Sequence, residues 1–99
     1  MTLAFDMYAD SRHEKIDHHE EFIFPYVTES AQFPELNFVW KNYYRDPKLS
    51  PTQSNKVVHE LIQLKPMLQS NSEHSMVGRL LQFFSYSYLN QVSVCCVSD

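Results

Sequence analysis

The segment from Pro34 to Pro66, PELNFVWKNYYRDPKLSPTQSNKVVHELIQLKP, constrains the fold of this chain more than any other. Its prolines bracket two stretches in which apolar residues recur at helical spacing. Proline is tolerated in the first turn of a helix, where its missing N–H would have no acceptor, and it pushes the preceding residue out of the α region. The sequence therefore predicts two amphipathic helices joined by a tight turn, from Pro34 to about Asp46 and from Pro51 to about Lys65.

The second predicted helix carries the stronger start signal of the two. Ser50 is a natural N-cap, Pro51 takes the first helical position, and Gln53 stands where a capping box has Glu or Gln. Apolar spacing assigns the following residues to the buried faces: Leu36, Val39, Trp40 and Tyr43 in the first helix, and Val57, Val58, Leu61, Ile62 and Leu64 in the second. We expect this helix pair to form the centre of the core.

The flanking segments predict two further helices. Residues 10–24 fit a polar helix that Asp10 or Ser11 caps and that Pro25 ends. The C-terminal half predicts another helix, which runs from a cap at Ser72 to about Leu89. Apolar spacing assigns these residues to its buried face: Met76, Val77, Leu80, Leu81, Phe84 and Tyr88.

Two residues of this last helix carry specific expectations. Asn90 suits the left-handed conformation that often closes a helix. Gly78 is the one glycine of the chain and lies inside the helix. We expect it to permit close approach of another helix, at a cost of about 1 kcal/mol relative to alanine.

The two ends of the chain leave one alternative open. The tail QVSVCCVS is β-branched and alternating, which predicts a strand. Residues 2–9 could form a short strand or the first turn of a helix, and periodicity does not decide between the two. As a strand, residues 2–8 could pair with residues 91–97. The predicted fold class is mainly α: a single domain over residues 1–99, built as a compact bundle of about four helices. The bundle could also include a short pair of strands formed by the two termini.

Charge is distributed unevenly along the chain. The net charge is −4, from 12 acidic and 8 basic residues. Residues 1–35 hold eight of the acids against Arg12 and Lys15, a local charge of −6, so the remainder carries four acids and six bases, or +2. An acidic N-terminal region disfavours direct contact with nucleic acid or an anionic membrane and favours a basic partner.

Cysteine usage and the lack of long apolar runs predict a cytoplasmic protein. Cys95 and Cys96 are adjacent, and because a disulfide between neighbours would be strained, we expect free thiols in a reducing compartment. The first residues, MTLAFDMYADSR, lack the basic and apolar regions of a signal peptide. No apolar run approaches the length of a membrane span.

No catalytic or cofactor-binding motif is complete in this sequence. A single glycine excludes the phosphate-binding loops of nucleotide-binding proteins. His59-Glu60 begins like a zinc-protease helix, but Gln63 stands where the second His must be, so we expect His59 at or near the surface. Cys95 or Cys96 with a distant His could form a nucleophile–base pair, but thiols in such an apolar run are usually buried and inert. We expect neither an enzyme nor a cofactor.

The densest cluster of potential metal ligands lies in the predicted N-terminal helix: His13, Asp17, His18, His19, Glu20 and Glu21. His13 and Asp17 are one helical turn apart and could share a metal ion. Structural zinc sites, however, usually recruit thiolates, or three to four ligands from more than one element. We therefore interpret the cluster as a solvated acidic helix face and expect no metal site.

Most of the chain follows a pattern known from one group of proteins. An aromatic helix, an Asp-Pro turn and a capped helix with Glu-Leu precede a further helix and a short terminal strand, through WKNYYRDPKLSP (residues 40–51), Glu60-Leu61 and Ser98-Asp99. The chain thereby resembles the small cytoplasmic immunity proteins encoded beside bacterial polymorphic toxins, particularly those of contact-dependent growth inhibition systems. It looks most like those that guard against a toxin nuclease, with a pancreatic-ribonuclease-like enzyme as the narrower candidate. The resemblance implies a role and no particular contact residues.

An acidic surface that bears tyrosine would complement the basic, phosphate-binding cleft of a nuclease. Tyr44 and Tyr86 fall off the buried stripes of their helices, and tyrosine is enriched at the energetic centre of interfaces. The hypothesis assigns toxin binding to these residues: Asp10, Glu14, Asp17, Glu20, Glu21, Tyr44 and Asp46. The protein would be a monomer or weak dimer that contacts neither nucleic acid nor membrane. The alternative function is that of a small regulatory or adaptor module that binds another protein. Such a module could be a homodimer.

Overall fold

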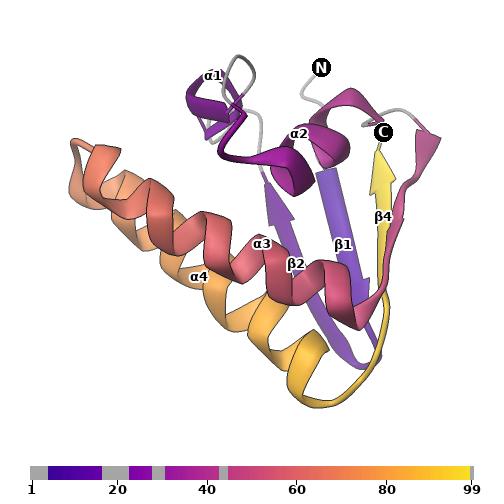
Figure 1. The fold of residues 1–99 in the computed structure, drawn as a ribbon. Coiled ribbons are helices and arrows are strands. Elements are labelled where there is room, and N and C mark those ends of the chain that lie inside the picture. The colour runs from indigo at the N-terminus through magenta and orange to yellow at the C-terminus, as the bar shows by residue number, and fades with distance from the viewer. Residues whose placement is uncertain (1–4, 17–22, 28–30, 43–44, 99) are drawn as a thin grey trace.

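The structure, a computed structural model, describes residues 5–16, 23–27, 31–42 and 45–98 (Figure 1). The described chain contains both strands and helices. In order, the elements are β1 (Phe5–Ala9), β2 (Arg12–Ile16), α1 (Ile23–Val27), α2 (Pro34–Lys41), β3 (Lys48–Leu49), α3 (Pro51–Leu64), the 3₁₀ helix η3 (Lys65–Met67), α4 (Asn71–Leu89) and β4 (Val94–Ser98). Within these residues no helix combines the length and the apolar character needed to cross a membrane.

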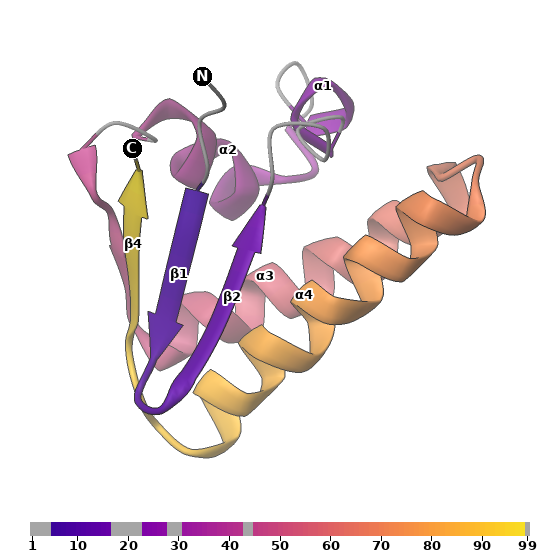
Figure 2. The ribbon, with the colours of Figure 1, turned by 180° about the vertical axis from the view of Figure 1, so that it is seen from behind.

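The strands form one antiparallel sheet in the order β2-β1-β4-β3. β1 and β2 make a hairpin in which Ala9 lies opposite Arg12. β4 returns beside β1, so that Met7 lies opposite Cys96, and the short β3 pairs with the other side of β4. Helices α3 and α4 cover one face of the sheet (Figure 1), whereas Figure 2 shows the opposite face uncovered by any described element.

This mixed α/β architecture shows that the predicted helical bundle is wrong. The terminal segments do pair, β1 with β4, but they belong to a larger sheet that includes β2 and β3. The main error lies at residues 10–24, where the structure has β2 and the start of α1 in place of one helix. β2 is an edge strand with one uncovered face, so its sequence is polar and lacks the apolar alternation that marks most strands.

The hairpin turn explains why Asp10 is not a helix cap. Asp10 has a φ of 57°, in the left-handed region, and with Ser11 it forms the two-residue connection between β1 and β2. Asp tolerates this conformation better than most residues. Pro25 does not end a helix either, because it lies inside the short α1, where an early N–H has no helical acceptor.

The capping-box prediction for α3 is confirmed. The Ser50 hydroxyl accepts from the Gln53 N–H at 3.1 Å, and the Gln53 side chain accepts from the Ser50 N–H at 2.9 Å. Helix α2 begins as predicted but ends earlier. Its C-cap is Asn42, whose side-chain amide donates to the Phe38 carbonyl at 2.8 Å and competes with continuation of the helix.

The central helix pair is α3 with α4, and not α2 with α3 as predicted. β3 separates α2 from α3 in the sequence, so these two helices are not joined by a tight turn. The buried hydroxyls of Ser54 in α3 and Ser87 in α4 are hydrogen-bonded at 2.9 Å, and Ser87 donates to the Val92 carbonyl at 2.5 Å. This network ties both helices to the segment that leads into β4.

The buried faces of α3 and α4 agree with the prediction only in part. In α3, Val57, Leu61 and Leu64 are buried as predicted. Ile62, however, is 53% exposed, and Glu60 is buried, with 6% exposure. In α4, Tyr88 is exposed and Phe83 is buried. Each helix packs against both the sheet and the other helix, so its buried sector follows two neighbours and not a single apolar stripe.

Three details of α4 also differ from the prediction. Its N-cap is Ser70 and not Ser72, with the hydroxyl accepting a first-turn N–H at 3.2 Å. At the other end Gln91, and not Asn90, has the positive φ, at 54°. Gly78 mediates no close approach, because a Cβ atom added there would meet nothing within 4 Å.

Candidate functional site

The uncovered side of the sheet carries side chains from all four strands. Alternate residues of a strand point to opposite faces, and the buried Met7, Cys96 and Leu49 identify the inner face. We call the outward set the open face: Asp6, Tyr8, His13, Lys15, Lys48, Cys95 and Val97. The strand register aligns four of them in one row across the sheet: His13, Tyr8, Cys95 and Lys48.

Tyr8 is held in a defined position on the open face. Its ring stacks on the His13 imidazole, with centroids 4.6 Å apart and an angle of 17° between the ring planes. His13 Nε2 lies 2.9 Å from Oδ1 of Asp6. Tyr8 and Val97 are each 45% exposed, so this strand pair presents an apolar patch with polar neighbours to solvent. An aromatic side chain already fixed in position loses little entropy when a partner covers it.

The open face itself is not acidic. Lys15 and Lys48 are exposed on its two outer strands, and its carboxylate, that of Asp6, is engaged with His13. Any acidic groups that attract a basic partner must therefore lie beside the open face. Asp10, exposed at the tip of the hairpin, is one such group.

The edges of the sheet are poorly suited to accept a further strand. On β2, the Lys15 N–H is bonded to Oε2 of Glu14 at 3.1 Å. On the other side, β3 has two residues and lies between Pro47 and Pro51. Charged residues, prolines and short length are the features by which proteins prevent edge pairing. The open face is therefore better placed than either edge to bind a partner.

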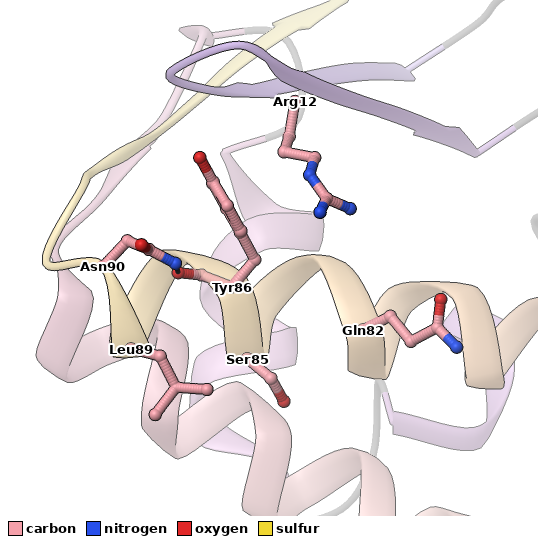
Figure 3. A pocket seen from close by; sticks show the side chains of 6 residues that line it. All are labelled: Arg12, Gln82, Ser85, Tyr86, Leu89 and Asn90. Atoms are coloured by element: carbon pink, nitrogen blue, oxygen red, sulfur yellow. Dashed lines mark hydrogen bonds between the residues drawn. The ribbon is translucent and has the colours of Figure 1, made fainter.

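A groove lies between the tip of the β1–β2 hairpin and the C-terminal half of α4 (Figure 3). We call it the Arg12 groove; it has a volume of about 400 Å³ and is lined by Arg12, Gln82, Ser85, Tyr86, Leu89 and Asn90. The guanidinium carbon of Arg12 lies 4.6 Å from the centroid of the Tyr86 ring. Leu89 is 76% exposed, so the lining of the groove includes an apolar side chain as well as a cation.

The structure does not bring the predicted acidic surface together at the described positions. Asp10 lies at the hairpin tip, whereas Asp46, with a φ of 50°, precedes β3 at the opposite end of the sheet. Glu14 lies on the side of β2 that faces α4, with Oε2 3.7 Å from a guanidinium nitrogen of Arg79. The remaining predicted site residues lie outside the described residues: Asp17, Glu20, Glu21 and Tyr44.

The structure also places the other residues that the sequence suggests as metal ligands, nucleophiles or surface aromatics. Among the described residues no three His, Cys, Asp or Glu side chains are arranged to hold a metal ion; most of the predicted ligand cluster falls outside them. His59 is exposed, as expected. Cys96 is buried, and burial raises the pKa of its thiol to about 12, whereas Cys95 is exposed on the open face, contrary to the expectation for both thiols. Tyr86 is half-buried beneath Arg12.

Sequence reasoning missed the residues that the sheet assembles, above all Tyr8, His13 and Arg12. The signal was the alternation on either side of Asp10-Ser11, which places Met7 and Ala9 inward and Tyr8 outward. A two-residue turn then makes the outward face continue through His13.

Comparisons with protein-family models, with curated proteins and with solved structures found no match.

Proposed function

We propose that this chain is a cytoplasmic immunity protein, a binding protein without enzymatic activity that neutralises a cognate toxin domain, and that the toxin is a nuclease. Two features support the proposal. The sequence resembles such proteins over most of its length, and the structure presents an uncovered sheet face with a pre-positioned aromatic side chain. The proposed mechanism is steric: the bound protein covers the basic surface with which the toxin holds its substrate.

The exposed, stacked Tyr8 is the observation that carries the proposal. Tyrosine, tryptophan and arginine dominate the binding energy of protein interfaces, where they form a centre surrounded by polar groups. Tyr8 has this setting, with Val97 beside it and the Asp6–His13 pair at its flank.

The open face alone is too small for a stable complex. Three five-residue strands and the two-residue β3, each about 4.8 Å wide and rising about 3.3 Å per residue, cover about 270 Å². A standard interface buries about 800 Å² on each partner. The proposed interface therefore extends past the hairpin tip at Asp10 and onto residues 17–22, which follow β2 directly in the sequence and include Asp17, Glu20 and Glu21.

Charge and packing then have separate roles in the proposal. Tyr8 and Val97 supply the apolar centre, while Asp10 and the acidic residues after β2 attract the basic groups of the toxin. Complementary charges of this kind mainly raise the association rate, and salt weakens their effect. Glu14 contributes only to the overall field, because it faces Arg79. Asp46 precedes β3 at the end of the sheet where β2 ends, away from the hairpin tip.

Binding to the product of the adjacent upstream gene tests the proposal. The purified parent chain should bind this product and suppress its nuclease activity. Tyr8→Ala should weaken binding at least tenfold, mainly through faster dissociation. Tyr88→Ala is the matched control, because Tyr88 is also an exposed tyrosine but lies on α4. If the parent chain does not bind, the proposal fails, and an equal effect of the two variants would reject the open face as the interface.

A charge-matched pair of variants tests the acidic residues. Asp17→Asn with Glu20→Gln and Glu21→Gln raises the net charge by three. The control, Gln63→Lys with Gln69→Lys and Ser75→Lys, raises it equally at exposed positions of the α3–α4 end. The first variant should associate with the toxin about tenfold more slowly at low salt, with the difference shrinking as salt is added. Equal rates for both variants would show that net charge, and not these carboxylates, attracts the toxin.

A further inference from the structure

We infer that the Arg12 groove is a receptor for a peptide carboxylate with an adjacent apolar side chain, donated by the protein partner. The inference deepens the proposed function and rests on it only in naming the toxin as that partner. The acidic residues proposed above bind basic groups of the partner. In the Arg12 groove the charges are reversed, because a cation of this chain binds an anion of the partner.

The guanidinium of Arg12 lies over an aromatic ring and has no ion-pair partner among the described residues. Its contact with the Tyr86 ring, at 4.6 Å, is the one interaction that the described residues give it. The Tyr86 ring covers one side of the guanidinium and offers no oxygen acceptor for its N–H donors. Two parallel N–H groups of a guanidinium match the two oxygens of a carboxylate, so Arg12 can form a bidentate bond with such a ligand.

Arg12 is not needed to satisfy the carbonyl groups at the C-terminus of α4. The Tyr86 carbonyl already accepts from the Asn90 backbone N–H at 3.0 Å and from the Asn90 side chain at 2.9 Å. The Tyr88 carbonyl accepts from Gln91 in the same two ways, at 3.2 and 2.6 Å. Since these last-turn carbonyls have their donors, Arg12 is not required as a helix cap.

The rest of the groove selects the kind of anion. Leu89 is the most exposed of the large apolar side chains in the described chain and also lines the groove. In Figure 3 it points to the opposite side of α4 from the contact between Arg12 and Tyr86. The side chains of Gln82, Ser85 and Asn90 add neutral hydrogen-bonding groups. A groove with one guanidinium and one apolar side chain in its lining fits an acidic residue next to an apolar one, and fits a bare phosphate less well. The groove also adjoins the hairpin tip, so one partner can cover the tip and the groove together.

A titration with matched dipeptides tests the receptor without the toxin. The isotope-labelled chain is titrated with N-acetyl-Leu-Glu-amide, with the uncharged N-acetyl-Leu-Gln-amide, and with inorganic phosphate. The Glu peptide should saturably shift the Arg12 Nε–H signal and the Leu89 and Asn90 amide signals, and the Gln peptide should not. Equal responses to both peptides, or no response, would overturn the inference. Phosphate binding as tight as that of the Glu peptide would overturn the assignment to a peptide.

Variants of the guanidinium separate the groove from the fold. Arg12→Gln should abolish the peptide response. Arg12→Lys should weaken it severalfold, because lysine lacks the two parallel N–H donors of the guanidinium. Arg79→Gln, which removes a guanidinium outside the groove, should leave it unchanged. Thermal unfolding confirms that each variant is folded. In the toxin complex, Arg12→Gln should lower affinity at least tenfold. If the parent and Arg12→Gln bind the toxin equally, the groove is not its receptor, although the proposed function stands.

Discussion

At the scale of single residues, a buried carboxylate links two helices. Glu60 in α3 accepts from the backbone N–H groups of Glu35 at 2.9 Å and of Leu36 at 3.0 Å, in the first turn of α2. The N-cap residue of α2, Phe33, has no side chain that can cap, so Glu60 caps the helix from a neighbouring element. Burial raises the pKa of Glu60 and outweighs these two hydrogen bonds, which lower it.

The raised pKa of Glu60 predicts a stability that depends on pH. The folded chain holds this proton more tightly than the unfolded chain, whose pKa is near 4.5, so the contribution of Glu60 to stability is greatest below pH 4.5. It falls as the pH rises through the higher folded pKa. In Glu60→Gln this fall should be absent, which urea unfolding measured between pH 4 and 8 can detect. Parallel curves for the parent and Glu60→Gln would contradict the assignment.

A second substitution at the same position separates charge from capping. Glu60→Ala removes both acceptors and leaves the N–H groups of Glu35 and Leu36 without them. It should destabilise the fold by about 1–3 kcal/mol at every pH in the series.

At the scale of elements, the start of α3 depends on its capping box. Ser50→Ala removes the acceptor for the Gln53 N–H and should lower the free energy of unfolding by about 1 kcal/mol. Thr52→Ala is the control, because Thr52 is exposed in the same turn and should change stability by less than about 0.5 kcal/mol. Urea denaturation of both variants measures the difference. Equal losses would mean that side-chain packing in this turn matters more than the cap.

The capping box was predictable from sequence because it involves four consecutive residues and no distant partner. The same is true of the helical segments around it, whose apolar spacing is local. The sheet was not predictable in this way. β2 buries little on its own and reads as a polar helix, since what makes it a strand is pairing with β1. The face of α3 that is buried also depends on packing against elements distant in the sequence. This packing leaves Ile62 exposed and buries Glu60.

The candidate site was harder to predict than the fold for the same reason. Acidic residues could be counted in the sequence, but their positions depend on the hairpin, which separates Asp10 from Asp46 and turns Glu14 toward α4. The row formed by His13, Tyr8, Cys95 and Lys48 draws one residue from each strand, and Cys95 and Lys48 are far from the hairpin in the sequence. Only the strand order and register bring them together.

At the scale of the whole molecule, the two adjacent cysteines report on two different environments. Cys95 is exposed on the open face, while Cys96 points into the core between the sheet and its covering helices. β4 lies between β1 and β3, so Cys96 becomes accessible only when the sheet separates from the helices. Its reactivity should therefore measure global unfolding.

Thiol labelling of the native chain should proceed in two distinct steps. One equivalent, Cys95, should react rapidly with a chromogenic disulfide reagent at pH 8. Cys96 should react slowly, because its side chain is buried and a pKa of about 12 leaves about 1 thiol in 10⁴ ionised. Urea should accelerate the slow step in proportion to the unfolded population. Cys95→Ser should remove the rapid step and leave the slow one unchanged, whereas two rapid equivalents in native buffer would contradict a closed core around β4.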